Sequence, residues 1–130
     1  MANADLKSAM RTYDRLILKT DADSIALLYT ADGDLGNAAH GRDSIRNFLN
    51  RFKEYKVLEQ VSTVDSIKIQ GDTGFLSGTF HQKTIIPIHD TLAMNRNHDT
   101  ISINGTFHSE WINIPEYGWE IKKFETAAGK

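Results

Sequence analysis

The chain has 130 residues, of which 40% are hydrophobic and 25% are charged, with a net charge of −2 and no cysteine. This length and composition predict one globular domain with a single core and exclude a disordered chain. The small net charge excludes a dominant basic surface, so we expect neither nucleic acid nor a membrane as a partner, and the lack of cysteine excludes disulfides and thiolate metal sites.

The N-terminal sequence, Met1 to Leu6, lacks the basic and apolar segments of a signal peptide. No apolar run approaches the roughly 20 residues that a membrane-spanning helix needs. We therefore expect a cytoplasmic protein that forms one domain over residues 1–130.

Three helices are predicted in the first half of the chain. Residues 4–20 repeat apolar side chains at spacings of three and four, which is the pattern of an amphipathic helix. A short second helix is expected over 21–29, followed by a turn at 31–34 and an extended piece at 35–40. The third helix covers about 42–55, and its apolar stripe is interpreted as core.

The second half of the chain changes to a period of two, which is typical of β-strands. Strands are predicted at about 57–69, 73–83, 100–114 and 119–126. Residues 84–99 interrupt this pattern and are interpreted as either a functional flap or a mobile loop. Helices followed by a run of strands predict an α+β fold, in which the helices pack on one face of a mostly antiparallel sheet.

The sequence Gly-Thr-Phe-His occurs twice in the predicted strands, at 78–81 and at 105–108. Strand alternation places the Thr and His residues on one face of the sheet and the Gly and Phe residues on the other. Two interpretations follow. Either the histidine face lines a pocket, or the aromatic face is the core and the histidines meet solvent. Residue type alone favours the second, because Phe and Trp are buried more readily than His.

The order and spacing of several short segments resemble the nuclear-transport-factor-like superfamily, which includes ketosteroid isomerases, SnoaL-like cyclases and scytalone dehydratase. The segments that carry the resemblance are Tyr13 to Tyr29, Ala31-Asp32, His40 to Ile45, Gly71 to Gly74 and Gly118 to Ile121. The resemblance implies a cone-shaped, curved and mostly antiparallel sheet wrapped around three N-terminal helices, a cystatin-like α+β barrel.

The resemblance also implies roles for individual residues. In ketosteroid isomerases a tyrosine on the first helix donates a hydrogen bond to the developing oxyanion, and Tyr13 matches that position. The general base of that family, an aspartate, is matched by Asn37, which cannot take up a proton at neutral pH. The third catalytic position, an acid, falls within one residue of Glu110. The departure at Asn37 argues against ketosteroid isomerase activity itself.

On the resemblance, the inner face of the sheet carries His81, His108 and Glu110, and Tyr13 lies nearby. A histidine beside a carboxylate is a workable acid–base pair, and a tyrosine in an apolar setting can stabilise an enolate-like charge. These four residues are the catalytic candidates. The two histidines and the glutamate also have the residue types of a metal site. The resembled family works mostly without metal, however, so we expect neither a metal nor another cofactor.

The same assignment of faces predicts a ligand pocket and a dimer interface. The residues expected to bind the ligand are Asn37, Phe48, Phe52, Phe75, Thr79, Ile112 and Trp119. Such a lining suits a small, largely apolar molecule with one or two oxygens. The outer face would then expose Phe80, Phe107 and Trp111. Such a patch is too apolar for a monomer surface and predicts a homodimer through this face.

Two functions are consistent with this sequence. The first is a pocket protein that catalyses proton transfer, as an isomerase, cyclase or dehydratase, on a small apolar carbonyl compound. The alternative is a member of the same fold that binds a ligand without catalysis or serves as a homodimeric association module. The sequence leaves open whether the chain is an enzyme.

Overall fold

The computed structural model describes residues 2–36, 38–52, 54–87 and 98–128. Within these residues the elements are α1 (Ala2–Leu18), α2 (Ala22–Leu27), β1 (Tyr29–Leu35), β2 (Ala39–His40), α3 (Arg42–Asn50), β3 (Lys56–Gln70), β4 (Thr73–Pro87), β5 (His98–Ile114) and β6 (Gly118–Ala128). The sheet has six strands in the order β2-β1-β6-β5-β4-β3. Neighbouring strands are antiparallel, except that β1 and β6 are parallel.

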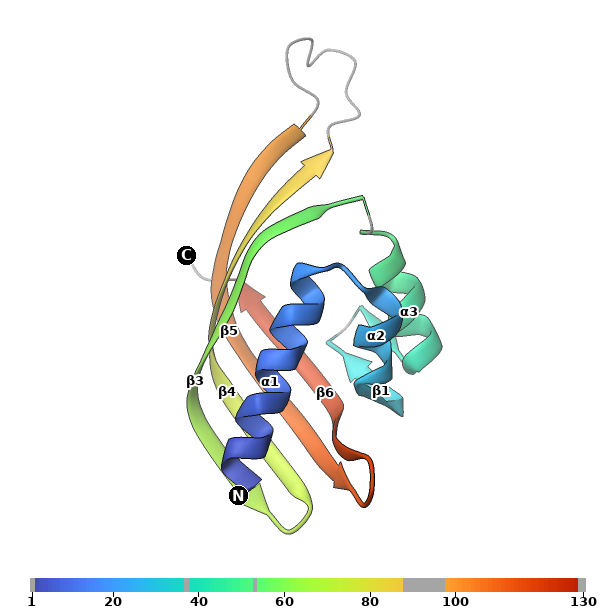
Figure 1. The fold of residues 1–130 in the computed structure, drawn as a ribbon, viewed down its shortest axis with the longest axis vertical. Helices are drawn as coiled ribbons and strands as arrows, with labels where there is room; N and C mark the ends of the chain where they lie inside the picture. The colour runs from blue at the N-terminus through green and yellow to red at the C-terminus, as the bar shows by residue number, and fades with distance from the viewer. Residues whose placement is uncertain (1, 37, 53, 88–97, 129–130) are drawn as a thin grey trace.

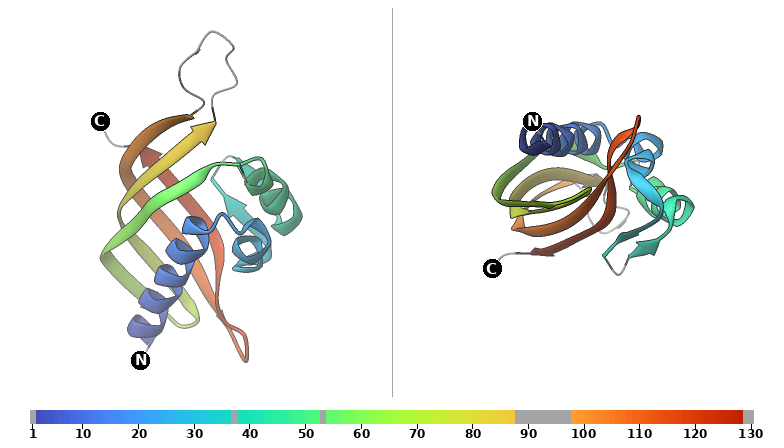
Figure 2. Two further views of the ribbon diagram at one scale, coloured as in Figure 1. Left: turned by 45° about the horizontal axis from the view of Figure 1, so that its top comes forward. Right: turned by 90° about the horizontal axis from the view of Figure 1, so that it is seen from below.

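The sheet curves around the helices without closing on itself. Figure 1 shows the helices on one side of the sheet, and the view from below in Figure 2 shows that this side is concave. Helix α1 packs against β3, while α2 and α3 pack against each other and against β1. The prediction of an α+β fold with a curved, mostly antiparallel sheet around three N-terminal helices is therefore confirmed, and the sheet is open rather than a closed barrel.

Two predicted elements near the helices have different boundaries in the structure. The segment 31–34, predicted as a turn, belongs to β1, whose pairing with β6 is irregular between Tyr29 and Asp34. Helix α3 ends at Asn50 rather than near Tyr55. In both places the local sequence is compatible with two conformations, and contacts with the rest of the chain select one of them.

Strands β4 and β5 are longer than predicted. Their backbones pair continuously from Thr73 opposite Ile112 to Pro87 opposite His98. Both ends of the predicted loop at 84–99 are therefore strand. Proline is compatible with this assignment because the pairing of β4 with β3 ends at Ile85, so Pro87 lies where β4 is an edge strand. Residues 88–97 lie outside the described part of the chain, so the predicted flap stays a prediction.

The core lies between the helices and the concave face of the sheet. Trp111 and Phe107 are 0% exposed and Leu76 is 1% exposed, whereas Phe75, on the opposite face of the sheet, is 39% exposed. His108 shares the exposed face. The prediction that the histidine face lines the interior is therefore wrong. Burying the aromatic side chains against the helices removes more apolar area from water than burying histidines would.

The predicted dimer face is part of this core. Phe107 and Trp111 are fully buried within one chain, and Phe80 is half-buried and packs against them. An apolar surface that the chain covers by itself needs no partner. The prediction of a homodimer through Phe80, Phe107 and Trp111 is therefore wrong.

Two glycines allow the sheet to bend. At Gly78 in β4, a Cβ atom would run into the carbonyl oxygen of Thr63, because β3 carries a register irregularity between Val64 and Ser66 at this point. At Gly105 in β5, a Cβ atom would lie 2.8 Å from Cε1 of the Phe80 ring. The absence of a side chain at these positions lets backbone and ring approach closely.

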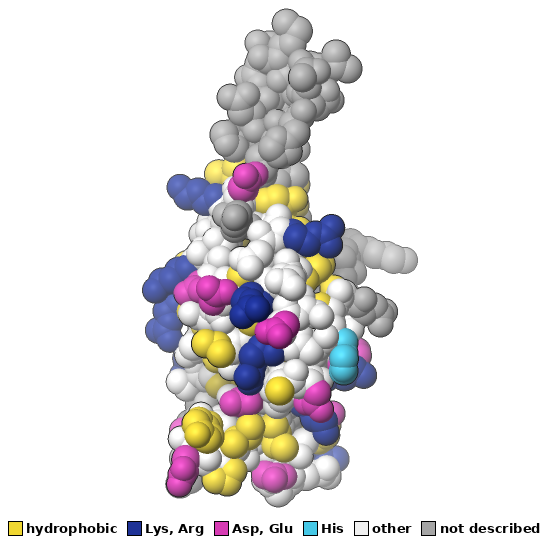
Figure 3. Space-filling view, turned by 90° about the vertical axis from the view of Figure 1, so that its right-hand side faces the viewer, with side chains coloured by type: hydrophobic (Ala, Val, Ile, Leu, Met, Phe, Trp, Pro, Cys, Tyr) yellow, Lys and Arg dark blue, Asp and Glu magenta, His cyan; other side chains and the backbone are white. Residues whose placement is uncertain are grey.

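Figure 3 shows the side of the molecule nearest α2 and α3, where Lys and Arg side chains are interspersed with Asp and Glu. On α3, for example, Arg46 Nη2 lies 3.3 Å from Asp43 Oδ1. Among the described residues on this side, no large patch of a single charge is visible. Among the helices that the structure describes, none combines the length and apolar character needed to cross a membrane.

The close approach at Gly78 predicts the effect of a single methyl group. Gly78→Ala should lower the free energy of unfolding by about 1–3 kcal/mol, because the added Cβ forces β3 and β4 apart. Urea unfolding would measure the change. Thr79→Ala, at the neighbouring exposed position, is the matched control and should stay within about 0.5 kcal/mol of the native chain. Equal stability of Gly78→Ala and the native chain would contradict this account of the bend.

Candidate functional site

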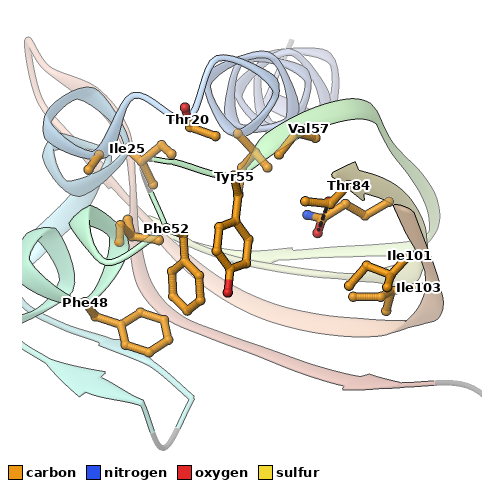
Figure 4. Close-up of a pocket in the computed structure, with 13 residues that line it drawn as sticks. Thr20, Ile25, Phe48, Phe52, Tyr55, Val57, Thr84, Ile101 and Ile103 are labelled. Atoms are coloured by element: carbon orange, nitrogen blue, oxygen red, sulfur yellow. Dashed lines mark hydrogen bonds between the residues drawn. The ribbon is translucent and has the colours of Figure 1, made fainter. Parts of the chain in front are cut away.

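A cavity of about 390 Å³ lies between the helices and the concave face, where β4 ends and β5 begins (Figure 4). Most of its wall is aliphatic. The aliphatic residues that line it are Ile17, Ala22, Ile25, Leu49, Val57, Ile101 and Ile103. Aliphatic side chains make van der Waals contacts with a ligand and cannot form hydrogen bonds with it. The cavity therefore favours an apolar ligand.

One wall of the cavity is aromatic. Phe48 on α3 and the two rings that follow the helix, Phe52 and Tyr55, pack edge to face, with ring centroids 5.2 Å and 5.1 Å apart. Figure 4 shows this wall across the cavity from Thr84 and Ile101. Each ring supports its neighbour, which holds the wall in place without a ligand.

A second cavity, of about 590 Å³, adjoins the first on the side of Tyr13. The residues that line both cavities are Ile17, Phe48, Leu49, Gln82 and Ile103. Phe107 and Phe124 add aromatic surface to the second cavity. Together the two cavities form the hollow interior of the cone.

A row of hydrogen-bonded polar side chains, which we call the polar strip, runs over the concave face from β4 through β3 to α1. Its members are Asp14, Gln60, Ser62, Gln82 and Thr84. Gln60 of β3 and Gln82 of β4 are direct cross-strand partners, and Thr84 is two residues further along the same face. Thr84 Oγ1 donates to Gln82 Oε1 at 2.9 Å, and Gln82 Nε2 donates to Gln60 Oε1 at 2.8 Å. Gln60 Nε2 in turn donates to Asp14 Oδ1 at 3.2 Å.

Asp14 on α1 is the fixed end of the polar strip. Besides Gln60, it accepts hydrogen bonds from the hydroxyl of Ser62 at 2.7 Å and from the backbone N–H of Ser62 at 3.1 Å. Burial raises the pKa of Asp14 above its usual value, and the hydrogen bonds from Ser62 and Gln60 offset part of that rise. One carboxylate thus joins the first helix to β3 and, through Gln60, to the cavity wall.

Two buried tyrosines meet next to the second cavity. The hydroxyl groups of Tyr13 and Tyr29 lie 2.9 Å apart, and the Tyr13 ring stacks on Phe124 with centroids 4.8 Å apart. Burial raises the pKa of the Tyr13 phenol to about 12 and that of Tyr29 well above its usual value. Both phenols are therefore protonated at neutral pH and can act as hydrogen-bond donors.

The structure does not bring the four catalytic candidates together. Tyr13 is buried on the concave side, whereas His81, His108 and Glu110 lie on the convex face. His81 Nδ1 is 2.8 Å from Asn104 Oδ1, an exposed neighbour on that face. The predicted cluster fails because the aromatic side chains of β4 and β5, and not the histidines, turn toward the helices.

The residues predicted to bind a ligand divide in the same way. Phe48 and Phe52 line the first cavity, as predicted. Phe75 and Thr79 are exposed on the convex face, and Ile112 lies on that face too, so the prediction is wrong for these three. The last two predicted positions do not enter the cavity lining either. Trp119 packs against the core over Gly74, and Asn37 lies outside the described residues.

The polar strip is the feature that the sequence analysis missed. Gln60 and Ser62, like Gln82 and Thr84, are polar residues two apart in a strand. The other inward-facing residues of β3 and β4 are aliphatic, aromatic or glycine. With the faces of the sheet assigned correctly, these pairs stand out as inward-facing polar positions. The role of Asp14 could not be predicted from a local pattern, because its partners Gln60 and Ser62 lie 46 and 48 residues away along the chain.

The histidines and acids of the described residues do not form a metal centre. Among these residues, no group of three His, Cys, Asp or Glu side chains lies close enough to hold a metal ion. Asp34 and His40 pair across β1 and β2, and this pairing raises the pKa of His40, but both side chains are exposed.

Comparison with known proteins shows the fold. No protein-family model matches the sequence, and no curated protein matches it. Among solved structures, an NTF2-like protein with a cystatin-like fold from Novosphingobium aromaticivorans is 15% identical, with a TM-score of 0.72, and covers 98% of this chain and 81% of its own. A ketosteroid isomerase-like protein from Erwinia carotovora atroseptica is 14% identical, with a TM-score of 0.77, and covers 98% and 95%.

A third similar structure is a candidate calcium/calmodulin-dependent protein kinase II association domain from Xanthomonas campestris. It is 15% identical to this chain, with a TM-score of 0.71, and covers 95% of this chain and 85% of its own. These likenesses show that the chain has the NTF2-like, cystatin-like fold that the sequence predicted. At such identities they show the fold alone.

The raised pKa of Asp14 predicts how stability depends on pH. The folded chain holds the Asp14 proton more tightly than the unfolded chain, in which the pKa is about 3.9. This contribution to stability is complete below the unfolded pKa and is lost as the pH rises through the folded pKa. The free energy of unfolding of the native chain, minus that of Asp14→Asn, should therefore increase as the pH is lowered from about 7 to about 4.

Urea unfolding at a series of pH values would measure this difference. Asp23→Asn removes an exposed acidic side chain from α2 and controls for the lost negative charge. A difference between the native chain and Asp14→Asn that stays constant, or that shrinks as the pH falls, would show that the environment of Asp14 does not favour its protonated form.

Proposed function

We propose that this chain binds a small, largely apolar molecule in the hollow between its helices and the concave face of its sheet. The observation that carries the proposal is the cavity of about 390 Å³ with its aliphatic and aromatic wall. Its volume lies within the range of roughly 300–1,000 Å³ that is typical of small-molecule sites. The supporting rings of Phe48, Phe52 and Tyr55 make the site largely preformed, which lowers the entropy cost of binding.

Binding is better supported than proton-transfer catalysis. Tyr13 lines the second cavity and keeps its proton at neutral pH. When Tyr29 is the donor in the hydrogen bond between the two phenols, the Tyr13 proton can be donated to a carbonyl oxygen of a ligand. A proton-transfer enzyme also needs a group that accepts a proton beside the ligand. Among the described residues that line the two cavities, the one acidic residue is Glu125, and no histidine is among them. The side chain of Glu125 is exposed and pairs with Lys123 on the convex face. The pocket therefore fits a binding role before a catalytic one.

A variant that fills the cavity tests the binding function. Ile103→Trp places a larger side chain in the space that both cavities share, and it should weaken the binding of naphthalene by about tenfold or more, equivalent to roughly 1.4 kcal/mol. NMR titrations that follow the backbone amide signals of the ¹⁵N-labelled chain would measure the dissociation constants of naphthalene for the native chain and for Ile103→Trp. Ser102→Trp, at the exposed neighbouring position of β5, is the matched control and should bind naphthalene like the native chain.

The native chain has to bind naphthalene for this function to stand. Amide signals of residues at the cavity should shift on titration, and those of the convex face should not. No shift in the native chain, or equal affinity in the native chain and in Ile103→Trp, would rule out the cavity as the binding site.

A second candidate function is association of two copies through the convex face of the sheet. Val61 is 56% exposed and Phe75 is 39% exposed on this face. The same face carries both charge signs, for example Lys123 and Glu125, whose Nζ and Oε1 atoms lie 2.9 Å apart. A two-fold copy would therefore meet apolar side chains and opposite charges at once. The candidate association domain from Xanthomonas campestris, with the same fold, supports this role.

A charge placed on the convex face tests this association. Phe75→Lys should raise the dissociation constant of the dimer by about tenfold or more, because a buried lysine in the interface loses its hydration. Sedimentation equilibrium over a range of protein concentrations would measure the constant. Leu27→Lys changes a 64% exposed leucine on α2 and should leave it unchanged. A native chain that remains monomeric at every concentration would exclude this function.

A further inference from the structure

The hydrogen bonds of the polar strip all point the same way. An ionised carboxylate has no proton to give, so Asp14 can only accept. The atom of Gln60 that faces Asp14 is therefore its amide nitrogen, and its carbonyl oxygen turns to Gln82. By the same logic the amide nitrogen of Gln82 faces Gln60, and its carbonyl oxygen accepts from the hydroxyl of Thr84. Asp14 thus sets the orientation of two amides and one hydroxyl.

The end of the polar strip that is opposite to Asp14 lies at the cavity. Gln82 and Thr84 both line the cavity of about 390 Å³, and the hydrogen bond between them is the dashed line in Figure 4. Thr84 is 3% exposed, and it faces the aromatic wall. Its hydroxyl proton is committed to Gln82, so the threonine oxygen offers a ligand only its lone pairs. The Gln82 nitrogen has a second proton that takes no part in the row.

We propose that the cavity selects apolar ligands that carry a neutral hydroxyl group, which donates its proton to Thr84 Oγ1 and accepts one from Gln82 Nε2. The inference rests on the proposed binding function and specifies the ligand of that site. A hydroxyl is both a hydrogen-bond donor and an acceptor. It therefore matches the acceptor oxygen of Thr84 and the second N–H of Gln82, which the polar strip does not use. Each hydrogen bond along the row polarises the next, which makes the threonine oxygen a better acceptor.

Charged groups fit this site less well than a hydroxyl. A carboxylate on the ligand has no proton for the threonine oxygen, and it would face the same row that ends in the Asp14 carboxylate. An ammonium would have to give up its hydration against aliphatic side chains such as Ile101 and Ile103. A ketone or ether could use the Gln82 proton but would leave the threonine oxygen without a donor.

Three probes of similar shape test this selectivity in the native chain: naphthalene, 2-methoxynaphthalene and 2-naphthol. The methoxy compound keeps the oxygen and lacks the proton. We expect 2-naphthol to bind about fivefold more tightly than 2-methoxynaphthalene, the factor that one net hydrogen bond typically contributes. Dissociation constants would come from titrations followed by the amide signals of the labelled chain.

Two variants test the residues. Thr84→Val preserves the shape of the side chain and removes its oxygen, so it should bind both oxygen-bearing probes equally, whereas Thr84→Ser should restore the preference. Asp14→Asn acts from outside the cavity. The amide of the new asparagine can donate as well as accept, so the hydrogen bonds of the polar strip no longer have one fixed direction. The preference for 2-naphthol over 2-methoxynaphthalene should therefore fall. Thr79→Val, the same substitution on the convex face, should leave the preference at about fivefold.

The outcomes separate this inference from the function on which it rests. Equal binding of 2-naphthol and 2-methoxynaphthalene by the native chain would overturn the inference and leave the binding function intact. Retention of the preference in Thr84→Val or in Asp14→Asn would also overturn it. Failure of the native chain to bind naphthalene would overturn the binding function, and the inference with it.

Discussion

The burial of aromatic side chains from β5 against the helices determines the rest of this structure. Once Phe107 and Trp111 turn toward the core beneath the helices, strand alternation assigns a face to each residue along β4 and β5. The concave face then receives the residues that line the cavities and the polar strip. The convex face receives His81 and His108. The burial of these two aromatic side chains thus determines which side chains of the sheet line the cavities and which are exposed to another protein.

The sequence predicted the elements and the fold because periodicity is a local property, visible in any window of the chain. It did not predict the faces. Both faces of β4 carry an aromatic residue, Phe75 on one and Phe80 on the other, so alternation alone is satisfied by either assignment. The irregularities in β3 add a second difficulty, because each extra residue reverses the alternation after it. The family resemblance carried over a pocket face that these side chains do not support.

The site combines an apolar cavity with polar groups that satisfy one another. Gln60 and Gln82 would weaken a purely hydrophobic core, yet their amides are paired across β3 and β4 and end on a carboxylate. Phe48 and Phe52 could be predicted because they repeat at helical spacing. The row from Thr84 to Asp14 could not, because it joins side chains of three separate elements whose contact exists only in the folded chain.

The bond between Asp14 and the backbone N–H of Ser62 has a consequence for assembly. Strand β3 is an edge of the sheet, and the unpaired amides of an edge strand are a ready template for a strand from another molecule. Here α1 packs against β3, and the Asp14 carboxylate accepts a hydrogen bond from one of these amides, that of Ser62. Extending the sheet past β3 would require displacing the helix and leaving a half-buried carboxylate without its partners. The helix thereby opposes pairing with another strand at Ser62, on the longer of the two edges of the sheet.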